Sequence, residues 1–234
     1  MPDCYELRRY QLRNGVQGRR LDDFLRDLAV PSFNLYGVQP VGVFHGMLGD
    51  ALPCVYLLLR HSSLESVAAV KNWLGADREF RKAAAFFHDV PAADPAFVRM
   101  ESVLLAALGG MPELEAPPEA KENRPRIFEL RTYESHGEAA LHRKIEMFNS
   151  AEIGIFRRTG LRPVFFGETL IGPRQPSLTY MLVFEDLAAR ERSWAAFRQD
   201  PEWRSLWSTP GLTDAEIVSN VTGVLLRPAP YSQI

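Results

Sequence analysis

The sequence predicts an α+β fold made of two tandem ferredoxin-like (βαββαβ) repeats, whose sheets enclose a barrel within one chain, in a dimeric-α/β-barrel type of arrangement. Three observations lead to this prediction. A short motif occurs twice, several landmark residues recur at one fixed offset, and one strand of each half is apolar throughout. Internal repetition of this kind indicates a duplicated structural unit.

The repeated motif is Glu-Leu-Arg-x-Tyr, which occupies positions 6–10 and again positions 129–133. The offset between the two copies is 123 residues (from Glu6 to Glu129), and it recurs along the chain. The pairs that share it are Glu6 and Glu129, Tyr10 and Tyr133, Gly37 and Gly160, Pro40 and Pro163, and Asp77 and Asp200. Such agreement is hard to attribute to chance, so we expect two structural repeats.

A segment rich in glycine, proline and charge separates the two copies. It reads GGMPELEAPPEAKENRPR over residues 109–126, a composition typical of a linker. We therefore expect a diverged N-terminal repeat over residues 1–108, a linker over 109–125 and a C-terminal repeat over 126–234.

The order of elements is clearest in the second half. Alternating and helical spacings of apolar residues predict strands and helices, and Asp186 and Asp200 are placed to cap two helices. The predicted elements are a strand over 128–133, a helix through 141–155 ended by Gly160, strands over 163–166 and 179–184, helices after Asp186 and from Pro201, and a strand over 221–227. This is the ferredoxin-like order. The first half follows it less cleanly, because Pro31 is expected to interrupt its first helix.

The third strand of each half indicates how the halves are arranged. Residues 55–59 (VYLLL) and 180–184 (YMLVF) are apolar without alternation, which is typical of strands covered on both faces. The simplest cover is a layer of helices on one face and the sheet of the other half on the second face. The alternative is two independent domains, each with helices on one sheet face.

The two copies of the motif supply the candidate site. Neighbouring residues of a strand point to opposite faces, so we expect Phe128, Leu130 and Thr132 to lie under the helices. The other set is then expected to point into the space between the sheets: Glu129, Arg131 and Tyr133, together with Glu6, Arg8 and Tyr10. One interpretation is that each Glu and Arg simply neutralises the other. The other is a site for a small polar ligand, in which Arg holds an anion or carbonyl and Tyr or Glu moves a proton.

Composition excludes several classes of protein. The net charge of −2 and the pI near 6.2 do not suggest a nucleic-acid partner. The chain begins without a signal-peptide pattern and has no apolar run long enough to span a membrane, so we expect a cytoplasmic protein. Cys4 and Cys54 begin the first and third strands, which are antiparallel neighbours, so their starts lie at opposite ends and we expect no disulfide between them.

No metal site or cofactor is predicted. The five histidines are scattered and show no spacing typical of metal ligands, and no glycine-rich phosphate-binding loop is present. Haem is the alternative that one of these histidines could serve, and His45, near the end of a strand, is the best placed.

Four stretches of the second half, FELRTY, GLRPVFFGETL, LTYMLVFEDLAARERSWAAF and DPEW, stand in order over nearly all of residues 126–234. Together they resemble the NIPSNAP family. The first half, with YELRRY and DREFR, resembles a diverged copy. The resemblance implies the dimeric α/β-barrel superfamily and brings no established reaction. Similar barrels serve as monooxygenases, haem-degrading enzymes and dehydratases, an analogy of fold alone.

Two classes of function follow from these observations. One is a barrel protein that binds a small polar molecule between its sheets and acts as a cofactor-free enzyme by proton transfer or oxygenation. The other is a non-catalytic binding or assembly protein whose barrel is filled by side chains. We also expect a homo-oligomer, because the helix face around Trp203 and Trp207 is apolar.

Overall fold

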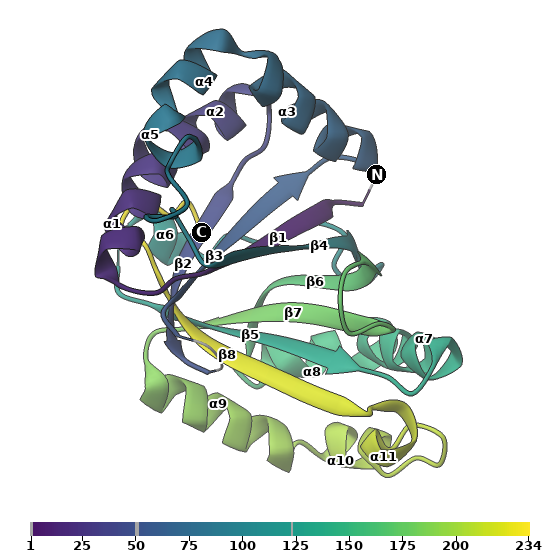
Figure 1. Ribbon diagram of the computed structural model, residues 1–234. Helices are drawn as coiled ribbons and strands as arrows, with labels where there is room; N and C mark the ends of the chain where they lie inside the picture. The colour runs from purple at the N-terminus through teal and green to yellow at the C-terminus, as the bar shows by residue number, and fades with distance from the viewer. Residues whose placement is uncertain (1, 50–51, 123) are drawn as a thin grey trace.

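The computed structural model describes residues 2–49, 52–122 and 124–234, and it shows two similar halves (Figure 1). The elements of the first half are β1 (Cys4–Gln11), α1 (Gly15–Phe24), the π-helical turn η1 (Leu25–Ala29), α2 (Val30–Leu35), β2 (Val41–Leu48), β3 (Cys54–His61), α3 (Leu64–Ala76), α4 (Arg78–Ala83), α5 (Ala85–His88) and β4 (Arg99–Ala107). Those that follow are α6 (Pro118–Lys121), β5 (Ile127–Glu134), α7 (Glu138–Met147), the π-helical turn η2 (Phe148–Glu152), α8 (Ile153–Arg158), β6 (Arg162–Ile171), β7 (Ser177–Phe184), α9 (Leu187–Gln199), α10 (Pro201–Trp207), α11 (Asp214–Ile217) and β8 (Asn220–Pro228).

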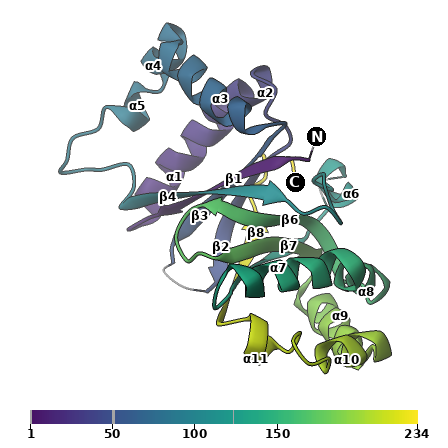
Figure 2. The same ribbon diagram turned by 90° about the vertical axis from the view of Figure 1, so that its right-hand side faces the viewer.

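The eight strands form one closed antiparallel barrel in the order β1-β3-β2-β8-β5-β7-β6-β4. Within each half the strands keep the ferredoxin-like order, and the pairs β2–β8 and β4–β6 join the two halves. Helices lie outside the barrel on two opposite sides, as Figures 1 and 2 show. The predicted fold class, two ferredoxin-like repeats enclosing a barrel within one chain, is therefore confirmed.

Of the apolar cores formed by the described residues, three involve the strands and hold this arrangement together. Two lie between a sheet and its own helices, one in each half. The third lies inside the barrel and draws on both halves; its members include Tyr5, Leu7, Phe44, Leu58, Phe128, Leu130, Phe165 and Met181. Strands β3 and β7 contribute to the barrel core with one face and to a helix-covered core with the other, which is why they are apolar throughout.

The side chains of β1 and β5 point to the opposite faces of the sheet from those predicted. Leu7 and Leu130 point into the barrel, while Glu6, Arg8, Tyr10, Glu129, Arg131 and Tyr133 point toward the helices. The register shows this directly, because Arg131 lies opposite Tyr180 of the helix-covered core and Leu130 lies opposite Met181 of the barrel core. The prediction that the motif faces the space between the sheets is therefore wrong. Buried charged groups need partners, and the helices supply them.

The first helical run of each half contains a π-helical turn. These turns, η1 and η2, begin at Leu25 and Phe148 and so keep the offset of the repeat. Pro31 follows η1 within α2, and the chain stays helical from Gly15 to Leu35. The expected interruption at Pro31 is therefore wrong, since the wider turn before it has already broken the regular hydrogen-bond ladder that proline would disturb.

Several local predictions are confirmed. Asp186 caps α9 through Ala189, and Asp200 caps α10 through Glu202 and Trp203. Gly160 ends its helix as predicted, with φ of 83°, a conformation that glycine adopts without strain, and Gly37 does the same at the equivalent position with φ of 80°. Cys4 and Cys54 are both buried, and no disulfide joins them. Of the helices in the described part of the chain, none combines the length and the apolar character that crossing a membrane demands.

The segment expected to be a linker is ordered where the structure describes it. It contains α6 and buries Met111 and Glu119. The Glu119 carboxylate lies 2.8 Å from Arg162 Nη1 at the start of β6. Asn123 lies outside the described residues, and the division of the chain at residues 109–125 stays a prediction.

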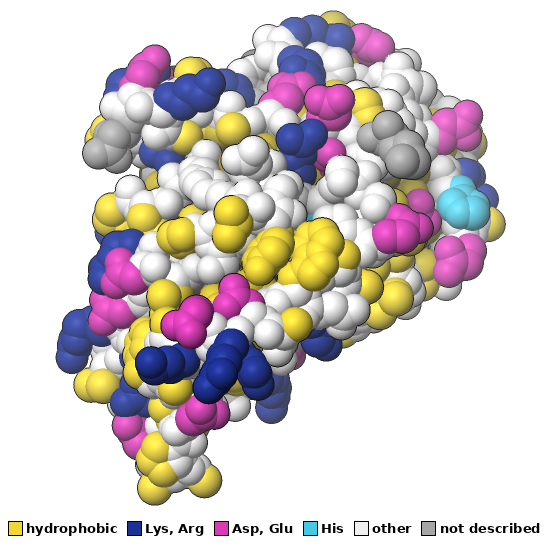
Figure 3. All heavy atoms as spheres, turned by 90° about the horizontal axis from the view of Figure 1, so that it is seen from above, with side chains coloured by type: hydrophobic (Ala, Val, Ile, Leu, Met, Phe, Trp, Pro, Cys, Tyr) yellow, Lys and Arg dark blue, Asp and Glu magenta, His cyan; other side chains and the backbone are white. Residues whose placement is uncertain are grey.

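The outer face of the first-half helices mixes apolar and charged side chains. Figure 3 views this face and shows hydrophobic side chains gathered near its middle, with Lys, Arg, Asp and Glu around them. Exposed large side chains on these helices include Leu35, Trp73 and Phe86.

The helical layer of the second half contains a fully buried ion pair. Lys144 Nζ on α7 lies 3.0 Å from a carboxylate oxygen of Glu152 on η2, and both side chains are at most 2% exposed. Burial opposes the charge of Lys144, but the adjacent carboxylate outweighs this effect and raises the pKa of the amine. In the first half the offset of 123 places Leu21 and Ala29 at these two positions, and both are buried.

The repeat therefore offers a direct test of this pair. Lys144→Leu alone is expected to lower the free energy of unfolding by about 3–5 kcal/mol, because it leaves Glu152 buried without a cation. Adding Glu152→Ala copies the first half and should recover most of this loss in urea denaturation. A double variant less stable than the single variant would contradict this account.

Candidate ligand-binding site

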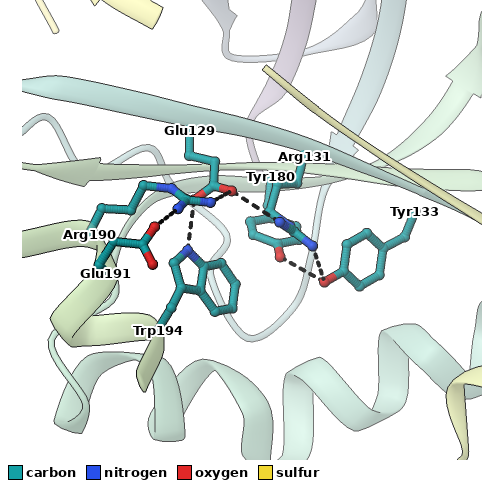
Figure 4. A network of polar contacts seen from close by, with 7 residues as sticks. All are labelled: Glu129, Arg131, Tyr133, Tyr180, Arg190, Glu191 and Trp194. Atoms are coloured by element: carbon teal, nitrogen blue, oxygen red, sulfur yellow. Dashed lines mark hydrogen bonds and ion pairs between the residues drawn. The ribbon is translucent and has the colours of Figure 1, made fainter. Parts of the chain in front are cut away.

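The carboxylate of Glu129 on β5 joins the sheet to helix α9. It accepts hydrogen bonds from Arg190 Nη2 at 2.7 Å, Arg190 Nε at 2.9 Å and Trp194 Nε1 at 2.8 Å. Arg131 on the same strand contributes a further contact, with Nη1 at 3.0 Å. Figure 4 shows these three side chains converging on Glu129. The single carboxylate of Glu129 thus accepts hydrogen bonds from side chains of both β5 and α9.

The surroundings of Glu129 keep it ionised. Burial alone would raise its pKa, but the hydrogen bonds from Arg190 and Trp194 and the charge of Arg131 outweigh burial and lower the pKa below its usual value. The side chain is only 3% exposed, so these contacts act with little screening by solvent.

Arg131 extends the network toward two tyrosines. Its Nη2 donates to the Tyr133 hydroxyl at 3.4 Å, and the Tyr180 hydroxyl donates to the same oxygen at 3.0 Å. The guanidinium also lies 5.0 Å from the centre of the Trp194 ring, within the range of a cation–π contact. Burial raises the pKa of Tyr180 well above its usual value, so its hydroxyl stays protonated.

A groove of about 730 Å³ opens beside this network, between β5 and helices α9 and α10. We call it the Trp–Arg groove and define it by the side chains that shape it: Arg131, Trp194, Arg198, Trp203, Arg204 and Trp207. Its walls combine flat aromatic rings with guanidinium groups.

The first copy of the motif lines a separate groove of about 780 Å³, which we call the first-half groove. Glu6 accepts hydrogen bonds from Arg8 at 2.7 and 2.8 Å and from Ser102 at 2.7 Å. The offset places Val67 and Lys71 at the positions of Arg190 and Trp194. Helix α3 therefore provides neither of the donors that α9 gives to Glu129, and apolar side chains such as Phe24, Phe33 and Phe80 form much of the wall.

The structure brings the predicted site residues together within each half but not across the halves. Glu6, Arg8 and Tyr10 share the first-half groove, while Glu129, Arg131 and Tyr133 share one network in the second half. Neither Arg190 nor Trp194 was predicted as a site residue. Their spacing of four residues on one predicted helix, which places both on one face, is the signal that could have identified them.

The barrel interior retains a smaller cavity of about 230 Å³ at one end. Drug-sized ligands usually occupy about 300–1,000 Å³, so the two helix-covered grooves suit such a molecule better.

His45, the histidine considered for haem, is engaged elsewhere. Its Nε2 lies 2.9 Å from a carboxylate oxygen of Asp22 on α1, and the Tyr231 hydroxyl donates to the same oxygen at 2.6 Å. It lines neither groove. Within residues 2–49, 52–122 and 124–234, no three His, Cys, Asp or Glu side chains cluster as metal ligands would.

The low pKa of Glu129 predicts how its contribution to stability depends on pH. At neutral pH, Glu129→Gln is expected to lower the free energy of unfolding by about 3 kcal/mol, because Arg131 and Arg190 lose their shared carboxylate. This contribution is complete above the unfolded-state pKa near 4.5 and is lost as the pH falls through the lower folded-state pKa. Urea denaturation at pH 7 and pH 3 should therefore show the gap between wild type and variant shrinking in acid. An equal gap at both pH values would contradict the assignment.

Comparison with solved structures agrees with this architecture. A suspected monooxygenase from Lactobacillus acidophilus matches with a TM-score of 0.62 at 7% identity, over 97% of this chain and 94% of that one. An anthrone oxidase-like protein matches with a TM-score of 0.59 at 9% identity, over 98% and 92%. A NIPSNAP-like domain protein from Burkholderia xenovorans is 24% identical, with a TM-score of 0.40, over 44% of this chain and 85% of that one. At these identities the likeness to the first two structures concerns the fold alone.

Comparison of sequences identifies the family. No curated protein matches the chain. The NIPSNAP family model matches two segments, residues 5–106 and residues 128–233, which together cover most of the chain and correspond to the two halves of the barrel. The chain therefore belongs to the NIPSNAP family.

Proposed function

We propose that this protein binds a small anionic molecule with an aromatic or apolar body in the Trp–Arg groove. The observation that carries the proposal is the pair Arg198 and Arg204. Both line the groove, and neither forms an ion pair with another of the residues that the structure describes. The main-chain carbonyl of Arg198 accepts a hydrogen bond from Arg204 Nε, which holds the two residues together.

The charge balance of the groove supports an anionic ligand. Arg131 and Arg190 are already neutralised by Glu129, and Glu191 pairs with Arg190. Asp214 is the remaining carboxylate among the residues that line the groove, against the two guanidinium groups of Arg198 and Arg204. Guanidinium groups bind carboxylates and phosphates through paired hydrogen bonds, so an oxyanion is the complementary group.

The aromatic side chains support an apolar or aromatic body in the ligand. Trp194, Trp203 and Trp207 line the same groove, and Trp207 is 49% exposed. Indole rings offer large flat surfaces that stack on aromatic groups and cover aliphatic ones. The volume of about 730 Å³ lies in the usual range for small-molecule sites.

A cofactor-free enzyme is the second candidate, and the network behind the groove favours it. Arg131 both lines the groove and donates to the Tyr133 hydroxyl, which Tyr180 also contacts. A substrate held beside Arg131 would therefore lie near two tyrosine hydroxyl groups. The names of the suspected monooxygenase and the anthrone oxidase-like protein make oxygenation the reaction to assay first. This is an analogy of fold.

Binding can be tested with 1-anilinonaphthalene-8-sulfonate, an anionic aromatic dye, and its uncharged analogue N-phenyl-1-naphthylamine. The anionic dye is expected to quench the tryptophan fluorescence of the groove in a saturable way. Changing Arg198 and Arg204 together to Gln should weaken binding of the anionic dye about tenfold and leave the uncharged dye unaffected, because charged hydrogen bonds are lost.

The repeat supplies a matched control. Arg81 of the first-half groove occupies the position of Arg204, so Arg81→Gln should leave quenching unchanged. An equal loss of affinity for both dyes would contradict the proposal. Equal losses of affinity for the anionic dye in Arg81→Gln and Arg204→Gln would contradict it as well. Light scattering on the same samples tests assembly: a mass above 26.4 kDa together with no quenching would favour Trp207 as a homo-oligomer contact instead. If the protein consumes oxygen in the presence of a molecule that binds in the groove, the cofactor-free enzyme is the better account.

A further inference from the structure

The small cavity inside the barrel has a composition unlike that of either groove. The polar side chains that strands of the first half contribute to its lining are Arg9, Tyr56 and Glu101. The second half supplies hydroxyl groups from Thr132, Thr179 and Thr222, and Arg174 lies in the loop between β6 and β7. The register places these strand residues on the inner face, since Arg9 lies opposite Glu101 and Tyr56, and Thr132 opposite Thr179 and Thr222.

Several hydroxyl groups of this cavity can donate a hydrogen bond to a ligand. The hydroxyls of Thr132 and Thr179 lie 2.8 Å apart, and those of Thr169 and Ser177 lie 2.9 Å apart. Each such pair uses one O–H as donor and leaves the other O–H for a further acceptor. Burial raises the pKa of Tyr56 to about 12, despite the nearby charges of Arg9 and Arg174, so its hydroxyl also remains a donor.

The charged side chains of the cavity also favour an anionic ligand, because cations outnumber anions there. Arg9 Nη1 lies 3.1 Å from Glu101, whose side chain is 40% exposed at the rim, and Arg9 Nη2 donates to Gln11. Arg174 has no ion pair with any residue in the described ranges; its Nη1 reaches the Thr222 hydroxyl at 3.5 Å. Two guanidinium groups therefore face one carboxylate, which Arg9 already engages.

The loop that carries Arg174 is held in an unusual conformation. Arg174 has φ of 63°, in the left-handed region that residues other than glycine rarely adopt. Gly172 packs so closely that an added Cβ would lie 2.9 Å from Val103 of β4. Strained residues of this kind cluster at ligand sites, where the surrounding structure holds them in place.

We propose that this end of the barrel binds a small oxyanion, a carboxylate or phosphate group carried on few other atoms. A donor-rich, positively charged cavity complements a group that only accepts hydrogen bonds. The volume of about 230 Å³ equals roughly seven to eight water molecules at their liquid volume of about 30 Å³ each, which limits the ligand to a compact one.

The site depends on the divergence of the two halves. The offset of 123 pairs Arg9 with Thr132 and Tyr56 with Thr179, so the cationic wall and the hydroxyl wall occupy equivalent strands. Two identical repeats related by a twofold axis would place the same residues on both walls. A tandem chain is free of this constraint and can oppose guanidinium groups with hydroxyls.

Calorimetric titration with inorganic phosphate and, separately, with malonate tests the proposal on the intact protein. Arg174→Gly removes the guanidinium and suits the left-handed backbone, so it should weaken binding at least about tenfold without lowering the melting temperature. Thr132→Val removes one hydroxyl at nearly constant volume and should weaken binding less. Arg26→Gln is the control and should leave binding unchanged, because Arg26 is an exposed residue of η1 that lines neither the cavity nor the two grooves.

The two titrations distinguish the source of the oxyanion. Binding of phosphate alone assigns a phosphate site, and binding of malonate alone assigns a carboxylate site; binding of both supports a general oxyanion site. The proposal is overturned if neither binds at concentrations up to about 10 mM, a very weak affinity. It is also overturned if Arg174→Gly binds as wild type does, or if Arg26→Gln abolishes binding.

Discussion

The second half of this molecule depends on the hydrogen bonds that the buried carboxylate of Glu129 accepts. It lies on the outer face of β5 and receives hydrogen bonds from Arg131 of the same strand and from Arg190 and Trp194 of α9. An ionised carboxylate away from water is tolerated only when charged or strong donors surround it. These donors fix α9 against the sheet, and the position of α9 in turn defines one wall of the Trp–Arg groove. The apolar neighbours of Glu129 on β5, Phe128 and Leu130, are thereby directed into the barrel.

The two halves show how one motif can serve different chemistries. In both, Glu and Arg of the motif pair beneath the helices. In the second half the helices add Lys144, Glu152, Arg190 and Trp194, and the result is a polar network. In the first half Leu21, Ala29, Val67 and Lys71 stand at these positions, and the groove is largely apolar. The barrel tolerates this divergence because apolar residues from both halves fill much of its interior.

Much of the fold could be predicted from the sequence, because it rests on signals that act locally. Strand alternation, the caps Asp186 and Asp200, and the doubly apolar strands β3 and β7 each correspond to a physical requirement that the structure meets. Alternation shows which residues share a face of β5, but it does not say which face is covered by helices. That choice depends on partners distant in the chain, and the donors on α9 lie about sixty residues beyond Glu129. The π-helical turns leave no periodicity that distinguishes them from an ordinary helix, so the path of the chain through Pro31 was missed as well.

The most direct test of this account is a double-mutant cycle between Glu129 and Arg190, measured by urea denaturation at neutral pH. If Glu129 faces the helices and holds α9, the variants Glu129→Gln and Arg190→Met should show a coupling free energy of about 1–3 kcal/mol, the range for residues that share one ion-pair network. A cycle between Glu129→Gln and Arg9→Met provides the reference, since Arg9 lines the barrel cavity. Its coupling should be close to zero. A coupling near zero between Glu129 and Arg190 would contradict the account, and a larger coupling between Glu129 and Arg9 would place Glu129 inside the barrel.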